Sequence, residues 1–493
     1  MVVAGLPRTA ERLAKQLALA FSLAALALTV VLAVRFDPAG PAVQFVEQRR
    51  WIPAFGVSYA LGLDGIALVL VALTAVLTPV VILAAWDEAV GSRRPAKTFF
   101  ALLLVTEAAA IGAFAATDVF LFYVFFEVML VPMYFLIGSF GGPQRSYAAV
   151  KFLLYSLAGG LLMLAAVIAL YVLGPGGEQG FLLSELQGKL ALDPTVQRWL
   201  FLGFFAAFAI KAPLWPVHTW LPDAASEATP GTAVLLFGVL DKVGTFGMIR
   251  YLLTLFPEAS RYFTPMIVVL SVVSILYGAL LAIGQTDMKR LLGYTSISHF
   301  GFIVLGIFAL TSQGQAGATL YMVNHGLSTG LLFIVVGFLM SRRGSRLIAD
   351  YGGVQRVAPL LAGTFLVGGL SALALPGLST FVSEFLVLVG TFTRYWVAAV
   401  LATLGIVLAA VYVLWMYQRM MTGPVRAGNE TIPDLRPREV WAAAPLLAFL
   451  LVLGFFPAPV LDVVNPAVRS TLQHVRVQDP APTVPTQAEG TAK

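Results

Sequence analysis

The sequence has no cysteine among its 493 residues and only four histidines. Without thiols, the chain forms no disulfide, no thiolate zinc site, no cysteine-ligated iron–sulfur cluster and no cysteine nucleophile. Charged residues are also scarce, at 11% against about 25% in an average soluble domain. Hydrophobic residues make up 59% of the chain. A soluble protein of this length could not bury so much apolar surface, so the composition indicates a protein that crosses a membrane many times.

Metal and nucleotide patterns are missing as well. The four histidines lie 81, 26 and 149 residues apart, which gives no close metal-ligand spacing. The glycine-rich stretch 174–180 has no following Lys-Ser/Thr, and no dinucleotide fingerprint is present. We therefore expect no metal and no cofactor on this chain. In a membrane protein, the net charge of +6 indicates basic cytoplasmic loops rather than a nucleic-acid partner.

Apolar segments of about 20 residues or more predict an all-α polytopic membrane protein with about 13 spans. The predicted spans are 16–35, 62–86, 98–116, 119–140, 146–173, 196–227, 231–254, 262–284, 289–310, 315–340, 357–393, 394–421 and 438–457.

Two of these spans are too long and too interrupted to be simple helices. Span 196–227 contains Pro213, Pro216 and Pro222, and span 357–393 contains Pro376. Each proline removes a helical hydrogen bond, and breaks at membrane depth persist only where they are buried in protein or line a polar cavity. The breaks fall five spans apart, which predicts an internal five-helix repeat with one broken helix in each copy.

The repeat divides the chain into expected regions. The N-terminal segment is 1–15, the N-terminal helices occupy 16–116, the first repeat is 119–254, the second repeat is 262–421, the C-terminal helix is 438–457, and a polar tail expected to be disordered is 466–493.

The basic residues predict the orientation. Of the 31 Lys and Arg residues, 18 fall in loops on the side of the N-terminus and 11 on the opposite side. The positive-inside rule therefore places the N-terminus in the cytoplasm, and an odd number of spans places the C-terminus outside. The two basic residues left over, Lys211 and Lys242, lie inside apolar segments.

Ionisable residues at membrane depth are the candidate functional residues. Each costs about 2.5–3.5 kcal/mol at the bilayer centre on insertion scales, so a functional role is the default hypothesis. The candidates are Glu107, Glu127, Lys211, His218, Asp241, Lys242, His299, His325 and Glu384.

Glu127 is the only charge inside its span, and the alternative to a functional role is an ion pair that merely locks helices. Lys211 stands two residues before the first break. A buried lysine can load and release a proton near neutrality, which arginine cannot, and the alternative is a side chain that reaches the interface. Asp241 and Lys242 are adjacent and so do not face each other, which leaves a structural pair and a functional role equally open for Asp241.

His299 and His325 each lie in a polar helix stripe, which suits a proton relay because histidine titrates near physiological pH. Glu384 follows the second break and is the counterpart of Lys211 in the repeat. Glu107 keeps three open interpretations: part of an acidic intake path, a contact with a partner subunit, or a structural residue.

Six stretches carry a resemblance to a known family. The first five, FYVFFEVMLVPMYFLIG, IKAPLWPVHTWLPDA, DKVGTFGMIRYLL, DMKRLLGYTSISHFGF and NHGLSTGLLF, resemble the antiporter-like membrane subunits of respiratory complex I. The sixth, FVSEFLVLVGTF, carries Glu384 and narrows the resemblance to the subunit M family, called chain 4 in mitochondria. The resemblance covers roughly residues 60–460.

This resemblance implies 14 membrane helices, two inverted five-helix repeats and a proton path along the membrane midplane. Glu127 would be the coupling carboxylate, Lys211 the pumping lysine, Lys242 the connecting lysine and Glu384 the exit carboxyl. The residues implied as relay positions are His218, His299 and His325.

Two departures from the family are evident. Ala225 stands where the family usually has a histidine, so a relay there is lost or taken over by water. The first family helix is not found, because residues 1–16 resemble its end and the following loop. Either the start codon is assigned too late or the helix is absent, and we favour the first interpretation.

The resemblance also implies partners and location. The chain would be a proton-translocating membrane-arm subunit of NADH-quinone oxidoreductase in the bacterial plasma membrane, beside L- and N-type paralogues. NADH, FMN, Fe–S clusters and quinone would be held by partner subunits. The alternatives are a subunit of a multi-subunit Na⁺/H⁺ (Mrp-type) antiporter and a structural anchor whose charges form static ion pairs.

Overall fold

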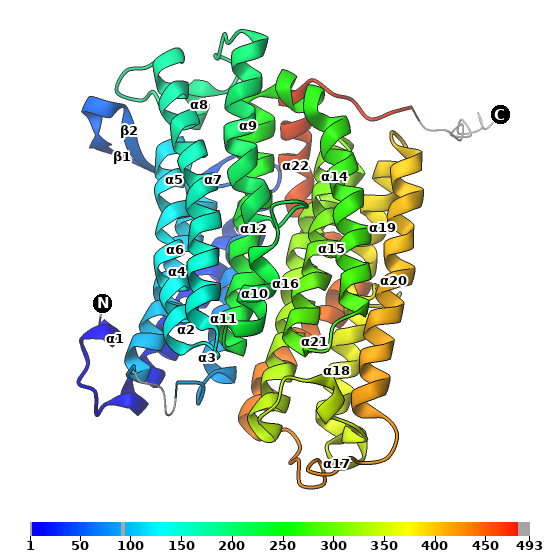
Figure 1. Ribbon diagram of the computed structural model, residues 1–493. Helices are drawn as coiled ribbons and strands as arrows, with labels where there is room; N and C mark the ends of the chain where they lie inside the picture. The colour runs from blue at the N-terminus through cyan, green and yellow to red at the C-terminus, as the bar shows by residue number, and fades with distance from the viewer. Residues whose placement is uncertain (1, 90–93, 482–493) are drawn as a thin grey trace, which may run out of the picture.

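A computed structural model describes residues 2–89 and 94–481 as a bundle of long, roughly parallel helices (Figure 1). Among these residues, eleven helices are long and apolar enough to cross a membrane. The predicted polytopic helical fold is confirmed. The N-terminal elements are α1 (Val2–Gly5), α2 (Glu11–Arg35), β1 (Gln44–Ile52), η1 (Pro53–Phe55), β2 (Val57–Leu63), α3 (Gly65–Ala84) and α4 (Ala96–Ala115).

The antiparallel hairpin of β1 and β2 departs from the predicted all-helical chain, and the sequence did not predict it. It lies at one end of the bundle in Figure 1, outside the helical layer. The predicted span 62–86 is corrected here, because its first two residues end β2 and its helix begins at Gly65. Asp64 caps that helix by accepting a hydrogen bond from the backbone N–H of Ala67.

The first predicted repeat, 119–254, holds the first broken helix. Its elements are α5 (Val119–Val128), α6 (Leu130–Phe140), α7 (Arg145–Leu173), α8 (Leu183–Leu186), α9 (Pro194–Lys211), α10 (Trp220–Glu227), α11 (Pro230–Leu235), the π-helical η2 (Leu236–Leu240), α12 (Asp241–Gly247), the π-helical η3 (Met248–Leu252) and α13 (Leu253–Leu255).

The second predicted repeat, 262–421, holds the other. Its elements and those that follow are α14 (Pro257–Ile283), α15 (Met288–Phe308), α16 (Ser312–Arg343), η4 (Ile348–Asp350), α17 (Val354–Val357), α18 (Pro359–Ala372), α19 (Ser379–Phe392), α20 (Trp396–Met421), α21 (Pro437–Phe455) and α22 (Ala458–Val475).

Both predicted breaks are present. The first runs over 212–219 between α9 and α10, and the second over 373–378 between α18 and α19. In the second break, Gly377 adopts a φ of 92°, a left-handed conformation that glycine tolerates without strain. Each break adjoins a buried ionisable residue: Lys211 directly precedes the first, and Glu384 follows the second in α19. The inversion that relates the two repeats stays a prediction.

The interior of the bundle is formed by Pro230–Leu255, α15 and α16, which are buried along almost their whole length. By contrast, α2, α20 and α21 lie outside and expose most of their residues. Apolar side chains such as Leu28, Val407 and Phe455 form this outer surface. The bundle is thus apolar where it would face lipid and carries its ionisable groups inside, as membrane proteins require.

The prediction of a disordered tail from residue 466 is wrong for its first ten residues. Helix α22 continues through Pro466 to Val475 and buries Val464, Val468 and Leu472 against the bundle. These apolar residues recur every four positions, and this spacing outweighs the proline and the polar composition. Residues 482–493 of the predicted tail lie outside the described residues.

Candidate functional site

Lys211 ends α9, directly before the first break, and its side chain is buried. Its ammonium nitrogen lies 4.7 Å from the ring centroid of Phe126 and 5.8 Å from that of Phe152. No hydrogen-bond partner for Nζ exists among the described residues. Aromatic ring faces therefore contact the ammonium directly, while the carboxylates of Glu127 and Asp241 act on it electrostatically without a hydrogen bond.

Glu127 lies in the last turn of α5 and faces α7 and Lys211. Its carboxyl rests against Gly160, where a Cβ atom would lie only 1.9 Å from Oε1. Its Oε1 has no hydrogen-bond partner in the described part of the chain, yet its charge acts on Lys211. The predicted pair is thus brought together as neighbours without a hydrogen bond between them.

Asp241 and Lys242 stand between the two π-helical segments η2 and η3, and both are fully buried. Neither carboxylate oxygen of Asp241 has a hydrogen-bond partner among residues 2–89 and 94–481. Asp241 interacts electrostatically with both Lys242 and Lys211. This position links the two lysines, a relationship that the sequence left open.

Lys242, in the first predicted repeat, makes a direct side-chain contact with a residue of the second repeat. Its Nζ lies 2.7 Å from Nδ1 of His325 and also donates to the backbone carbonyl of Phe237. The other ring nitrogen of His325, Nε2, lies 3.2 Å from Oγ of Ser296. The contact joins α12 to α16 and α15 in the interior of the bundle.

His299, Tyr321 and Glu384 continue the line. Nδ1 of His299 lies 2.6 Å from the hydroxyl of Tyr321, and that hydroxyl lies 3.5 Å from Oε2 of Glu384. The rings of His299 and His325 are neighbours, with centroids 5.3 Å apart. Side chains from α15, α16 and α19 thereby connect Lys242 to the helix that follows the second break. Tyr321 belongs to the polar helix stripe of His325, four residues away, but it was not among the candidate functional residues; that spacing was the signal.

His218 and Glu107 do not join this line. His218 is buried in the first break with its ring against Tyr277, and the charge that acts on it is that of Lys151. Lys151 in turn pairs with Asp223 at 2.7 Å. Glu107 lies on α4 and is buried near Thr78 of α3. Both residues therefore stand beside the line, and their predicted roles stay predictions.

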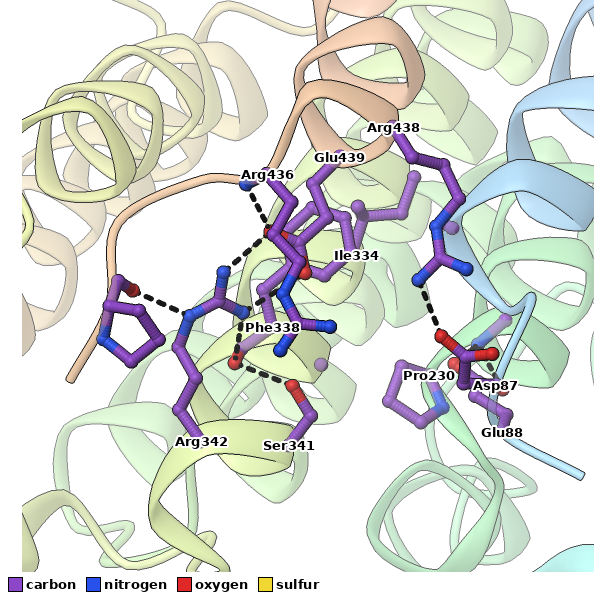
Figure 2. A pocket seen from close by; sticks show the side chains of 14 residues that line it. Asp87, Glu88, Pro230, Ile334, Phe338, Ser341, Arg342, Arg436, Arg438 and Glu439 are labelled. Carbon is purple, nitrogen blue, oxygen red and sulfur yellow. Dashed lines mark hydrogen bonds and ion pairs between the residues drawn. The ribbon is translucent and has the colours of Figure 1, made fainter. Parts of the chain in front are cut away.

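A pocket of about 480 Å³ lies at the C-terminal end of α16, remote from the buried line (Figure 2). Arg342 and Glu439 form an ion pair of 2.5 Å in its wall, and Arg438 bonds Asp87 at 2.7 Å. Glu88 accepts the backbone N–H of Gly231 at 2.9 Å. These contacts hold α16 and α21 against the chain after α3. None of the residues that line the pocket belongs to the series of buried side chains from Lys242 to Glu384.

The fold and the site define a class: a polytopic helical membrane protein with a line of buried ionisable side chains between two broken helices. No group of three potential metal-binding side chains occurs within the described ranges. Hydrogen-bond contacts join Lys242 to His325 and His299 through Tyr321 to Glu384, and the two histidine rings lie side by side between them. Such a line of titratable groups is suited to passing protons by short side-chain movements.

Comparison with known proteins gives the family. Residues 116–409 match the family described as NADH:quinone oxidoreductase/Mrp antiporter, TM. The chain is 55% identical to NADH-quinone oxidoreductase subunit M of Mycobacterium tuberculosis, over 99% of this chain and 95% of that protein. It is 39% identical to NADH-ubiquinone oxidoreductase chain 4 of Arabidopsis thaliana, over 95% and 94%. The chain therefore belongs to the NADH-quinone oxidoreductase subunit M family, as the motifs predicted.

Solved structures agree with this assignment. A chain of respiratory complex I from Thermus thermophilus is 33% identical and superposes with a TM-score of 0.85, over 96% of both chains. A chain of the Mrp complex from Dietzia sp. DQ12-45-1b shares the fold, with a TM-score of 0.83, 24% identity and coverage of 94% and 95%.

Proposed function

We propose that this chain is the proton-translocating subunit M of the membrane arm of NADH-quinone oxidoreductase. The observation that carries the proposal is the buried line from Lys242 through His325, His299 and Tyr321 to Glu384. Membership in the subunit M family supports it. NADH, FMN, Fe–S clusters and quinone belong to partner subunits in this proposal, and the chain's own residues hold and move protons.

In this proposal, the pair Glu127 and Lys211 controls when the proton is released. Two unit charges about 4 Å apart interact by about 4 kcal/mol at an effective dielectric near 20, which is enough to decide whether a buried lysine keeps its proton. Quinone reduction elsewhere in the complex changes the field at Glu127. When the carboxylate moves away or is neutralised, Lys211 holds its proton less firmly and releases it.

The released proton then travels along the buried residues. Asp241 lies within electrostatic reach of both lysines and can receive charge between them. Lys242 passes a proton to Nδ1 of His325 across 2.7 Å. From His325 the proton reaches His299 and then, through the hydroxyl of Tyr321, Glu384 beside the second break. Glu384 is the residue that releases it outside.

Partners and orientation follow the same proposal. L- and N-type subunits flank this chain in a bacterial plasma membrane, with the N-terminal side in the cytoplasm. The excess of basic residues in the loops on that side supports the orientation.

The test is Lys211→Met in the assembled complex, with proton pumping measured in vesicles energised by NADH. We expect pumping to be lost while the complex remains assembled, because the methionine keeps the volume and removes the titratable group. Lys189→Met is the matched control, since Lys189 pairs with Glu185 in an exposed loop. Undiminished pumping by an assembled Lys211→Met complex would contradict the proposal.

The Mrp-type antiporter is the second candidate because its complex shares this fold. Sodium–proton exchange in vesicles without any redox donor would favour it. Relatives named subunit M, at up to 55% identity over nearly the whole chain, support the first proposal instead.

A further inference from the structure

One face of α7 lies beneath the Glu127 and Lys211 pair. Phe152, Ser156 and Gly160 follow one another at intervals of four residues and therefore share that face. Phe152 presents its ring to the ammonium of Lys211, and Gly160 contacts the carboxyl of Glu127. Ser156 stands between these two contacts. None of the three carries a charge, and all three are buried.

The carboxyl of Glu127 lies directly against Gly160. A Cβ atom added there would lie 1.9 Å from Oε1, 2.7 Å from Cδ and 3.0 Å from Oε2, and these three nearest atoms all belong to Glu127. The adjacent Gly159 serves a different purpose. Its Cβ would meet the backbone of Ala207 at 2.9 Å and the side chain of Ile210 at 3.0 Å, so it permits close packing of α9.

Ser156 offers a hydroxyl beside the pair. Its Oγ is buried and, like Oε1 of Glu127 and Nζ of Lys211, has no hydrogen-bond partner among the residues that the structure describes. Buried polar atoms in folded proteins are almost always bonded, so each of these three atoms retains the capacity to bond a partner. A hydroxyl both donates and accepts, and can therefore serve the carboxylate or the ammonium.

We propose that Gly160 and Ser156 are positioning residues for the Glu127 and Lys211 pair. Gly160 leaves the space in which the carboxyl rests on α7, and the hydroxyl of Ser156 is the bonding partner that either group uses while the other is engaged. The inference rests on the proposed proton-translocating function and adds to it two uncharged residues that set the geometry of this pair.

The first test is Gly160→Ala in the assembled complex, with protons pumped per NADH oxidised as the readout. The methyl group pushes the carboxyl of Glu127 off α7, and a displacement on the order of 1 Å at a reacting group reduces rates by about tenfold or more. Alanine forms helices better than glycine, so a weaker α7 does not explain such a loss.

The discriminating variant is the double change Gly160→Ala with Glu127→Asp. Aspartate is one methylene shorter and fits beside the new methyl group, so pumping rises above that of Gly160→Ala alone. Gly363→Ala in α18 is the control, because an added Cβ there meets no atom within 4 Å. If the Gly160→Ala complex pumps like the wild type, or if Glu127→Asp does not relieve its loss of pumping, Gly160 does not position the Glu127 carboxyl.

The second test is Ser156→Ala, compared with Ser156→Thr, which keeps the hydroxyl. We expect alanine to lower pumping several-fold and to shift its pH profile, and threonine to retain the wild-type profile. An unchanged rate and profile for Ser156→Ala overturns the role of the hydroxyl.

The variant Glu127→Gln distinguishes a failure of the positioning roles from a failure of the proposed proton-translocating function. Full pumping by Glu127→Gln overturns the proposed function itself. Lost pumping in Glu127→Gln together with unaffected Gly160→Ala and Ser156→Ala overturns only the positioning roles.

Discussion

The ammonium of Lys242 lies 2.7 Å from Nδ1 of His325, and both side chains are buried. A charged lysine only donates, so Nδ1 accepts and the imidazole proton sits on Nε2, which faces the hydroxyl of Ser296 at 3.2 Å. Transfer of one proton from Lys242 to Nδ1 turns the ring into an imidazolium with two donors. With Lys242 charged, the contact therefore sets the resting tautomer of His325, with Nε2–H toward Ser296.

Replacing His325 with leucine removes the acceptor of Lys242 and interrupts the line. We expect pumping in NADH-energised vesicles to fall by about a hundredfold or more, which begins at the lower end of what a single proton-transfer group contributes. His474→Leu is the control, because His474 bonds only the backbone of Ser470 on α22. Equal pumping by the two variants would remove His325 from the path.

Tyr321→Phe deletes the hydroxyl between His299 and Glu384 and keeps the ring. We expect slower pumping with an assembled complex, since the 2.6 Å and 3.5 Å contacts both end on that oxygen. Tyr251→Phe is a matched control: its buried hydroxyl donates to the carbonyl of Ala116, away from the line. That control should cost about 1 kcal/mol of stability and leave pumping intact.

The ion pair of Arg342 and Glu439 is predicted to stabilise the fold rather than to move protons. Both side chains are only 5% exposed, so Glu439→Gln leaves a buried guanidinium without its counter-charge. Loss of one partner of such a pair costs about 3–5 kcal/mol. Thermal unfolding of the purified complex measures it. Glu185→Gln, in an exposed pair with Lys189, should change stability by less than about 1 kcal/mol.

Asp118 gives a pH-dependent prediction. It lies just before α5, where it accepts the backbone N–H groups of Leu121 and Ser58. Burial raises the pKa of Asp118 from 3.8 to about 6, against the effect of these hydrogen bonds. Ionisation is thus harder in the folded chain than in the unfolded chain, so the contribution of this carboxyl to stability is present below pH 3.8 and is lost as the pH rises through about 6.

The measurement compares the unfolding midpoints of wild type and Asp118→Asn between pH 4 and pH 7. The asparagine does not titrate, so the wild type should lose stability relative to the variant as the pH rises across this interval. A constant difference between the two proteins over the interval would show that Asp118 does not titrate there.

The sequence predicted the helices and the breaks because both depend on local rules. A run of about 20 apolar residues has few alternatives to a membrane helix. Pro213 and Pro376 stand at the two breaks, where the missing backbone N–H and the ring clash disfavour a continuous helix. The buried charges were equally visible, since Lys211 and Lys242 are the only basic residues left once the loops are counted. Helix α22 was missed because proline and polar residues hid an apolar spacing of four.

The connections between charges were not predictable from spacing. Asp241 and Lys242 are neighbours in sequence and face different partners, and the placement of Asp241 near Lys211 depends on how α12 packs against α9. That packing requires Gly244, where a Cβ would lie 2.8 Å from the backbone of Ala212. The hairpin of β1 and β2 was likewise hidden, because its strands pair with each other outside the apolar layer.

The two π-helical segments on either side of Lys242 have a consequence for its orientation. An α-helix turns by about 100° per residue, and a π segment accommodates an extra residue in its turn. Deleting one residue from η2 would therefore restore an ordinary helix and rotate Pro230–Leu235 by about 100° relative to Lys242. The side chains of the segment from Pro230 to Leu255 therefore face their partners at only one rotation about the helix axis. The contact of Lys242 with His325 depends on this rotation as much as on the two side chains.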